Sequence, residues 1–256
     1  MENLLCIDIG NTNIVLGVYR GEELASQWRI ATDHQKMPDE YAILLRHLLA
    51  YGGHRPEEVS GIALASVVPP LTGVFEELCL RYFRQEPLVV GVGIRTGVCI
   101  RYDNPHEVGA DRVANAAAAY RLYGGPACIV DFGTATTFDA ISPEGNYLGG
   151  AISPGIGISA EALFSRTAKL PRIDLARPPK VIGSNTVQSM QSGLIFGYVG
   201  LVEGMVARFR RELGPQMLVI ATGGLAEIIA RETDVLQIID PWLTLKGLRL
   251  IYNLNR

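Results

Sequence analysis

Two short segments of the chain place an acidic residue before a polar, glycine-containing turn. Asp8 is followed by the turn Gly10-Asn11-Thr12-Asn13, and Asp131 is followed by a similar turn that begins at Gly133. Such turns offer backbone N–H groups to phosphate oxygens, and a carboxylate beside a bound phosphate suits a hydrated magnesium ion. For the first segment alone, an ordinary hairpin whose Asp and Asn residues satisfy turn geometry is an equal alternative.

The two segments align without gaps, which favours the phosphate-binding interpretation. Asp131 falls on Asp8, Gly133 on Gly10, Thr134 on Asn11 and Thr136 on Asn13, at an offset of 123 residues in a chain of 256. A repeat of this length indicates two paired domains rather than a solenoid. Two such turns predict a nucleotide held in a cleft between the two halves.

A third segment, Gly109-Ala110-Asp111-Arg112, opens an alanine-rich helix that should end at Gly124-Gly125. The first turn of a helix favours negative charge, so Asp111 could be an ordinary helix-start residue. The functional alternative is a carboxylate that accepts a proton from a hydroxyl, with Arg112 holding an anionic group nearby.

The composition is that of a globular protein without an electrostatic nucleic-acid footprint. The net charge is −3, apolar residues make up 48% of the chain, and no basic cluster is present, which argues against nucleic-acid binding. No apolar stretch of about 20 residues favours a membrane span, and the N-terminus does not resemble a signal peptide. The four cysteines, each in an apolar run, are expected to be buried, reduced thiols of a cytoplasmic protein.

Hydrophobic periodicity predicts the elements that position these residues. We expect a third strand over 22–32, a helix from Pro38, a strand over 59–68, a second helix after Pro69-Pro70 and a strand over 87–93. The second half should contain a hairpin over 128–142, a strand-to-helix junction at 217–229 and a final helix from Pro241. This is a mixed α/β layer architecture.

The segments between those elements carry two further expectations. Residues 165–185 form a polar, proline-bearing connection, and Thr186 begins a long helix whose broad apolar face predicts a homodimer, with internal packing as the alternative. The stretch Gly155 to Ala160 matches G-x-G-x-x-A but lacks the following acidic strand of a dinucleotide site. It is better explained by close ligand approach or tight helix packing.

No G-x-x-x-x-G-K-[ST] sequence and no protein-kinase signature occurs. Taken together, the motifs resemble the superfamily of acetate and sugar kinases, actin and heat-shock chaperones, and within it the type III pantothenate kinases. The segments that carry this resemblance are DIGNTN (8–13), GADR (109–112), DFGTATTFD (131–139), GGAISPGI (149–156) and TGGLA (222–226).

The resemblance implies an α/β fold of two duplicated ribonuclease H-like domains, residues 1–115 and 116–256, each a mixed five-stranded sheet with helices. It implies ATP-dependent phosphorylation of pantothenate to 4′-phosphopantothenate, with ATP, Mg²⁺ and a monovalent cation (K⁺ or NH₄⁺). In such an enzyme, Asp111 is the general base, Asp131 binds the monovalent cation and Asp8 binds magnesium, directly or through water. The nucleotide-binding positions are Asp8, Ile9, Gly10, Asn11, Thr12, Asn13, Ile14, Val15 and Thr134.

The resemblance also assigns the pantothenate contacts to Tyr102, Gly109, Ala110, Asp111, Arg112 and Thr186, the last across a dimer interface. Two alternatives remain. One is a non-catalytic transcriptional accessory relative of the same fold, which could lose the GADR segment. The other is a different small-molecule kinase of the superfamily, which would share only the nucleotide half of the site.

Overall fold

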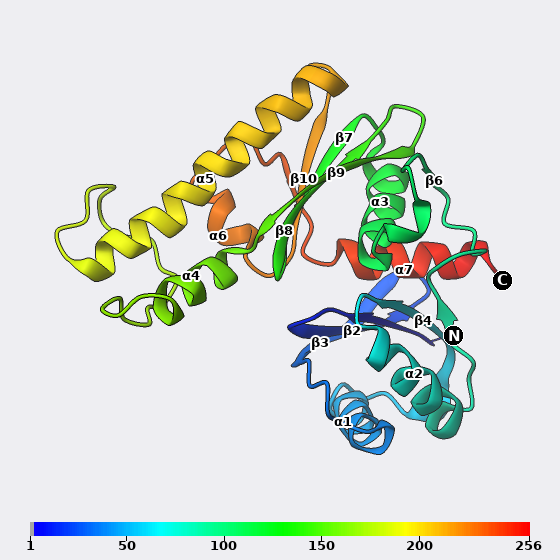
Figure 1. Ribbon diagram of the computed structural model, residues 1–256. Coiled ribbons are helices and arrows are strands. Elements are labelled where there is room, and N and C mark those ends of the chain that lie inside the picture. Colours follow the sequence, from blue (N-terminus) through cyan, green and yellow to red (C-terminus); the bar gives the residue numbers. More distant parts are fainter. Residues whose placement is uncertain (1–2) are drawn as a thin grey trace. The chain divides into compact units, whose positions relative to one another are not determined.

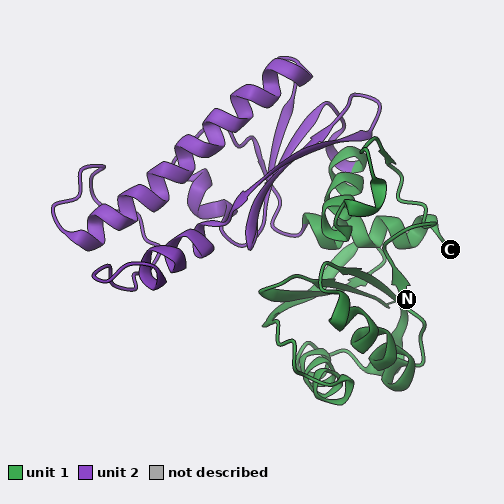
Figure 2. Cartoon of the chain, viewed as in Figure 1, with its two compact units in different colours: residues 1–121, 243–256 green, residues 122–242 purple. Residues whose placement is uncertain are grey.

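The computed structural model describes residues 3–256, which form two compact units (Figures 1 and 2). The first unit contains residues 1–121 and 243–256, and the second contains residues 122–242. Compared with the expected division at residue 115, the C-terminal helix is grouped with the first unit. The packing of that helix, described below, is the reason.

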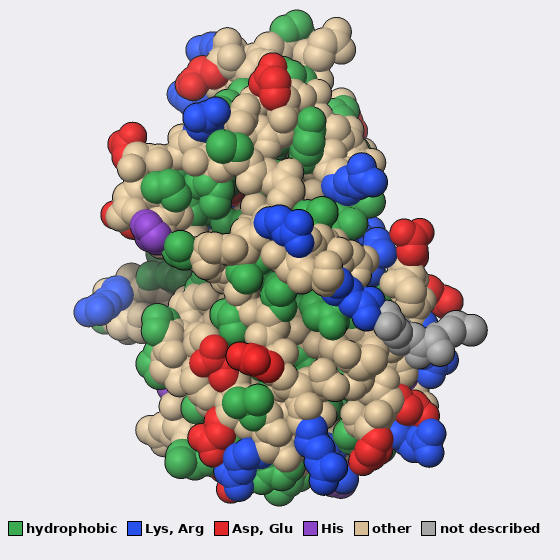
Figure 3. Space-filling model, turned by 90° about the vertical axis from the view of Figure 1, so that its right-hand side faces the viewer, with side chains coloured by type: hydrophobic (Ala, Val, Ile, Leu, Met, Phe, Trp, Pro, Cys, Tyr) green, Lys and Arg blue, Asp and Glu red, His purple; other side chains and the backbone are tan. Residues whose placement is uncertain are grey.

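On the face drawn in Figure 3, Lys and Arg side chains lie among Asp and Glu side chains, with apolar groups between them. This mixture agrees with the small net charge of −3.

Cys6, Cys79 and Cys128 are buried free thiols, but Cys99 is exposed. The expectation that all four are buried is therefore wrong for Cys99, which lies on a strand of only two residues.

The sheet of the first unit has five strands in the order β3-β2-β1-β4-β5. The central strand β1 pairs antiparallel with β2 and parallel with β4, so the predicted hairpin and third strand are confirmed. The strand expected over 87–93 is reduced to two residues. The bounds are β1 Asn3–Ile9, β2 Asn13–Arg20, β3 Glu23–Ala31, β4 Val59–Ser66 and β5 Leu88–Val89.

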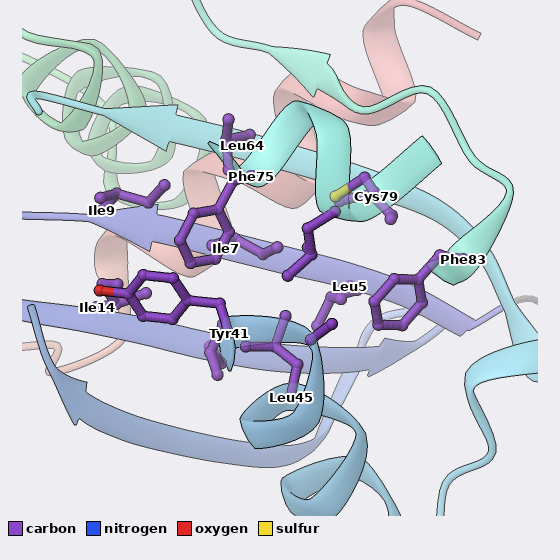
Figure 4. Packing of buried hydrophobic residues seen from close by; sticks show 14 of the residues in the cluster. Leu5, Ile7, Ile9, Ile14, Tyr41, Leu45, Leu64, Phe75, Cys79 and Phe83 are labelled. Carbon is purple, nitrogen blue, oxygen red and sulfur yellow. The ribbon is translucent and has the colours of Figure 1, made fainter. Parts of the chain in front are cut away.

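Helices α1 (Pro38–Tyr51) and α2 (Pro69–Leu78) cover one face of this sheet. Each begins with proline, whose fixed φ suits a first helical turn. Figure 4 shows Tyr41 of α1 and Phe75 of α2 over the apolar side chains of β1, and their ring centroids are 4.8 Å apart. Both rings are fully buried, which contributes about 1.5–3 kcal/mol per side chain.

Helix α7 (Leu243–Leu254) packs on the opposite face of the same sheet. A Cβ on Gly17 of β2 would lie 2.7 Å from Leu245 Cδ1, and one on Gly61 of β4 would lie 1.9 Å from Tyr252 Oη. Helix α3 (Ala110–Tyr123) joins α7 in this layer, since Thr244 Oγ1 donates to Asn115 Oδ1 at 2.8 Å. These contacts explain why the last helix belongs to the first unit.

The second unit repeats the arrangement of the first. Its strands lie in the order β9-β8-β7-β10-β11, where β7 pairs antiparallel with β8 and parallel with β10. The duplication expected from the two Asp-containing turns is therefore present in the topology. The bounds are β7 Ala127–Phe132, β8 Ala135–Ile141, β9 Asn146–Pro154, β10 Leu218–Thr222 and β11 Ile238–Ile239.

Helices α4 (Ile156–Ser165), α5 (Thr186–Leu213) and α6 (Ala226–Ala230) belong to this second unit. By length and hydropathy alone, α5 could cross a membrane. Its residues Ile195, Val202 and Val206 are instead buried in the core of the unit, as expected for a core helix. The remaining short elements are strand β6 (Cys99–Ile100), the 3₁₀ helices Pro56–Glu58 and Pro105–Glu107, and the π-helical turn Cys79–Phe83.

Candidate functional site

Asp8 lies one residue before the end of the central strand of the first unit. It is half-buried and lies opposite Val15 of β2 and Ala65 of β4. The following turn is closed by a hydrogen bond from Gly10 N to Asn13 O at 3.0 Å, and the Asn11, Thr12 and Asn13 residues are exposed. The structure thus presents a polar turn directly beyond a carboxylate.

Thr32, which follows the third strand, fixes that turn from the side. Its backbone N–H donates to Thr12 O at 2.9 Å, and its hydroxyl donates to Gly10 O at 2.6 Å. Sequence reasoning missed this residue. The signal that could have found it is its position immediately after β3, where the paired strand brings it beside the hairpin turn.

The GADR segment lies beside the end of the same strand. Asp111 is the second residue of α3, and its Oδ1 accepts the backbone N–H of Arg112 at 2.8 Å. A Cβ on Gly109 would lie 2.5 Å from Asp111 Oδ1 and 3.2 Å from Val67 Cγ1. Val67 in turn donates its N–H to Ile9 O at 3.1 Å. The Asp111 carboxylate is therefore connected, through Gly109 and Val67, to the strand that carries Asp8.

The other expected contacts of the first unit differ in exposure. Arg112 is buried, with 8% of its surface exposed, whereas Tyr102 is exposed at 37% in the loop before α3. That loop is shaped by Asn104, whose Oδ1 accepts the N–H of His106. Ala110 begins α3 and, like Gly109, is only partly exposed. The segment can therefore present one carboxylate from a rigid helix and one aromatic hydroxyl from a loop.

In the second unit, Asp131 lies at the matching position of the central strand β7, opposite Thr137 of β8 and Thr222 of β10. Its carboxylate is enclosed by glycine: a Cβ on Gly223 would lie 2.6 Å from Asp131 Oδ1, and one on Gly133 would lie 3.6 Å away. Gly223 also has φ +91°, a conformation that glycine adopts at little cost. Asp131 Oδ1 therefore lies so close to the backbone of Gly223 that no larger residue fits there without a shift.

The second turn is one residue shorter than the first, which corrects the gapless alignment. Gly133 N donates to Ala135 O, whereas Gly10 N donates to Asn13 O. Thr134 O accepts the N–H of Gly155, just as Thr12 O accepts that of Thr32. Thr134 is therefore the counterpart of Thr12, not of Asn11, and Ala135 rather than Thr136 corresponds to Asn13. Gaps inside a turn cannot be placed from so short a match.

Glycine at position 155 is explained by close packing. A Cβ there would lie 2.1 Å from Thr134 O, so only glycine allows the start of α4 to approach the second turn. This agrees with the tight-packing interpretation of the G-x-G-x-x-A match. The helix α4 that begins at Ile156 is followed by irregular chain, so the segment is not a dinucleotide-binding unit.

Thr186 lies at a different feature of the second unit. It is the first residue of α5, whose N-terminus is capped by Asn185 through a 2.9 Å bond from Gln188 N. It is exposed and lines a cavity of about 1060 Å³ between α4, α5 and the irregular segment before α5. Arg166 and Tyr198 also line this cavity.

The oxygen donors at the first turn fit the magnesium ion that this turn suggests. Within residues 3–256, no three His, Cys, Asp or Glu side chains gather as a metal cluster. Mg²⁺ is commonly held by one or two carboxylates together with substrate phosphates, and Asp8 beside the turn supplies one carboxylate. Asp131 supplies a second single carboxylate, which lies against the backbone of Gly223 beside the second turn.

Comparisons with known proteins show the family to which this chain belongs. Residues 4–208 match the family model described as type III pantothenate kinase. A relative from Moorella thermoacetica named type III pantothenate kinase is 56% identical over 98% of this chain and 99% of its own.

Two solved structures share the fold at low identity. A Campylobacter jejuni protein described as a conserved Baf family transcriptional activator has TM-score 0.58 and 20% identity, over 98% of each chain. An inorganic polyphosphate/ATP-glucomannokinase from Arthrobacter sp. strain KM has TM-score 0.53 and 15% identity, over 100% of each chain. These similarities show that the chain shares the α/β fold of these two structures.

Proposed function

Because this chain belongs to the type III pantothenate kinase family, which phosphorylates pantothenate with ATP in coenzyme A biosynthesis, we propose a role for each residue of the site. The reaction forms a bond between the pantothenate hydroxyl oxygen and the γ-phosphorus of ATP, breaks the bond to the β-phosphate oxygen and releases ADP. Such transfers depend mainly on positioning and charge neutralisation.

Asp111 is the general base of this proposal. The observation that supports it is that Gly109 lies close to both the Asp111 carboxylate and Val67. Val67 in turn donates a hydrogen bond to Ile9, in the strand that holds Asp8. The carboxylate is held by the Arg112 N–H at the start of a helix, where negative charge is favoured. It accepts the proton of the attacking hydroxyl, and this assistance typically contributes 10²–10⁴-fold.

The first turn binds the ATP phosphates through residues Asp8 to Val15. Exposed Asn11, Thr12 and Asn13 lie at the tip of a hairpin whose geometry is fixed by Thr32. Thr134, which occupies the corresponding place in the second unit, makes a further nucleotide contact. Asp8 would hold magnesium, directly or through water, which would neutralise phosphate charge, and Asp131 would hold K⁺ or NH₄⁺, which would add positive charge beside the second turn.

Pantothenate is held by Tyr102, Gly109, Ala110, Asp111 and Arg112. Arg112 can pair with an anionic group through its guanidinium, which forms strong bonds to carboxylates. Its burial favours a fixed position, because a packed side chain loses little further freedom when the substrate binds.

Thr186 completes the pantothenate site from a second copy of the chain. It begins α5 close to exposed apolar side chains: Val181 is 65% exposed, Ile182 87% and Val187 41%. Burying these groups against a partner would remove apolar area from water. A homodimer, placed in the cytoplasm and without nucleic-acid or membrane partners, is the form we propose. Light scattering that gives a monomer at micromolar concentration would contradict it.

The non-catalytic alternative is disfavoured because the 56% identical relative is named a kinase and because the GADR segment is intact. Whether the chain phosphorylates pantothenate or a different acceptor can be decided by testing whether its ADP release depends on pantothenate. The test is ADP release from ATP and magnesium, with or without pantothenate, in potassium or in sodium alone. Release that requires both pantothenate and potassium supports the proposal, whereas release independent of pantothenate overturns it.

A further inference from the structure

The C-terminal helix α7 contacts the helix that carries the proposed base. Near the beginning of α7, Thr244 Oγ1 donates to Asn115 Oδ1 of α3 at 2.8 Å. About one turn later, a Cβ on Gly247 would lie 2.0 Å from Ala114 O, so the two helices touch through their backbones. Asp111 lies in the first turn of α3, and its helix is therefore held against the first half of α7.

The other end of α7 lies beside the loop that leads to Tyr102 (Figure 1). Asn255, directly after the helix, binds both backbone groups of Arg95 through its side-chain amide. Its Oδ1 accepts the Arg95 N–H at 3.0 Å, and its Nδ2 donates to Arg95 O at 2.8 Å. An amide nitrogen has two protons, and Nδ2 also donates to Ile251 O at 2.8 Å. The amide is therefore fixed to the helix and holds the loop by a pair of hydrogen bonds.

The chain between Arg95 and Tyr102 also touches this end of α7. Gly97 has φ +78°, and a Cβ there would lie 3.1 Å from Leu254 Cδ1. Strand β6 follows, and Tyr102 lies two residues beyond its end. The end of α7 therefore supports the loop over the residues that come shortly before Tyr102.

We propose that Asn255 is a positioning residue for pantothenate: by binding Arg95, it holds the loop that carries Tyr102. Helix α7 is the common support, because it holds both this loop and the helix that begins beside Asp111. The inference rests on the proposed pantothenate contacts of Tyr102 and the GADR segment. A loop that is ordered before binding loses less freedom when the substrate binds, so the two bonds to Arg95 strengthen pantothenate binding.

The test is steady-state kinetics of the full chain, with either pantothenate or ATP varied. Asn255→Ala removes both bonds to Arg95. Asn253→Ala is the matched control, because Asn253 is an exposed residue of the same last turn of α7. Thermal unfolding establishes that each variant is folded at the assay temperature.

We expect Asn255→Ala to raise the KM for pantothenate by about three- to tenfold. The kcat and the KM for ATP should stay close to wild type, because α3 is attached to α7 roughly three helical turns away from Asn255. A higher KM with unchanged kcat shows the loss of an interaction made equally in the ground state and the transition state. Asn253→Ala should match wild type in all three constants.

A double variant separates this role from a general structural one. If Asn255 acts through Tyr102, then Asn255→Ala should raise the KM for pantothenate no further in a Tyr102→Ala chain. A full additional rise in that chain overturns the inference. So does an Asn255→Ala variant with a wild-type KM for pantothenate, or one whose KM for ATP rises by the same factor.

If Asn255→Ala does not fold, Asn255→Asp decides in the same way, because it keeps the acceptor for the Arg95 N–H but loses the donor to Arg95 O. A Tyr102→Ala variant with an unchanged KM for pantothenate overturns the pantothenate contact of Tyr102, and this inference with it. The proposed activity is tested independently of both, by the pantothenate dependence of ADP release in the wild type.

Discussion

The Asp111 carboxylate lies over the backbone of Gly109, so close that a Cβ on Gly109 would be 2.5 Å from Asp111 Oδ1. The glycine of the GADR segment is thus required by the position of the carboxylate two residues later. The same Cβ would lie 3.2 Å from Val67 Cγ1, so an added methyl group could not easily move away from the carboxylate. The position of the proposed base therefore depends on the absence of a side chain at residue 109.

Replacing Gly109 with alanine should displace the Asp111 carboxylate while leaving the fold intact. A displacement of about 1 Å can cost 10²-fold in rate, so we expect kcat to fall by up to about that factor with little change in the KM for ATP. Steady-state kinetics measure this. Gly91→Ala is the control, since its Cβ would meet nothing within 4 Å, and equal kinetics for the two variants would contradict the explanation.

Thr32→Val should weaken nucleotide binding without changing the substrate that is phosphorylated. The substitution removes the 2.6 Å hydrogen bond to Gly10 O, and a bond of this kind contributes about 0.5–1.5 kcal/mol. We expect the KM for ATP to rise by about two- to tenfold. Thr32→Ser keeps the hydroxyl and should restore the wild-type value, and an unchanged KM in Thr32→Val would show that the turn is held by other contacts.

The packing of α7 on the first unit can be tested at Gly61. Alanine at this position would bring its Cβ to 1.9 Å from Tyr252 Oη, and overpacking of this kind costs about 1–3 kcal/mol. Urea unfolding should show this loss. The double variant with Tyr252→Ala should be more stable than the sum of the single effects predicts. Gly73→Ala, with open space around it, is the control; additive effects would contradict the contact.

His54 should make the unfolding free energy depend on pH. Its Nδ1 accepts from Arg20 at 3.3 Å and its Nε2 donates to Ser26 Oγ at 2.8 Å, so the ring is neutral. Burial, followed by the charge of Arg20, lowers the pKa of His54 below 6.5, although Glu58 opposes the shift.

Because the unfolded chain binds this proton more readily, the stabilising contribution is complete above pH 6.5 and is lost as the pH falls through the lowered pKa. Urea unfolding between pH 5 and 8 should show a weaker slope for His54→Gln. The exposed His47 provides the control, and a His54→Gln slope equal to wild type would contradict this source of pH dependence.

Hydrophobic periodicity was sufficient to predict most elements of the fold. The two hairpins, the helices after Pro38 and Pro69, and the long helix from Thr186 are confirmed. The two-residue strands β6 and β11 carry too few residues for a pattern. The placement of α7 with the first unit depends on Gly17 and Gly61, whose lack of side chains is meaningful only once their neighbours are known.

The candidate site was predictable as motifs but not as contacts. Asp8, Asp111 and Asp131 were predicted from the two repeated Asp-containing turns, the GADR segment and the family resemblance. Thr32 was missed because it contacts the turn from a neighbouring strand, and pairing registers are not visible in a single sequence. The one-residue difference between the two turns was hidden for the same reason.

The central claim is that Asp111 accepts the proton of the pantothenate hydroxyl during transfer from ATP. The most direct measurement is the rate of phosphopantothenate formation, followed by mass spectrometry, for the wild type and Asp111→Asn in potassium with magnesium. We predict one phosphopantothenate for each ADP in the wild type. In the folded variant we predict a rate lower by about 10²–10⁴-fold, with little change in nucleotide affinity. Near-normal phosphopantothenate formation by Asp111→Asn would contradict the account.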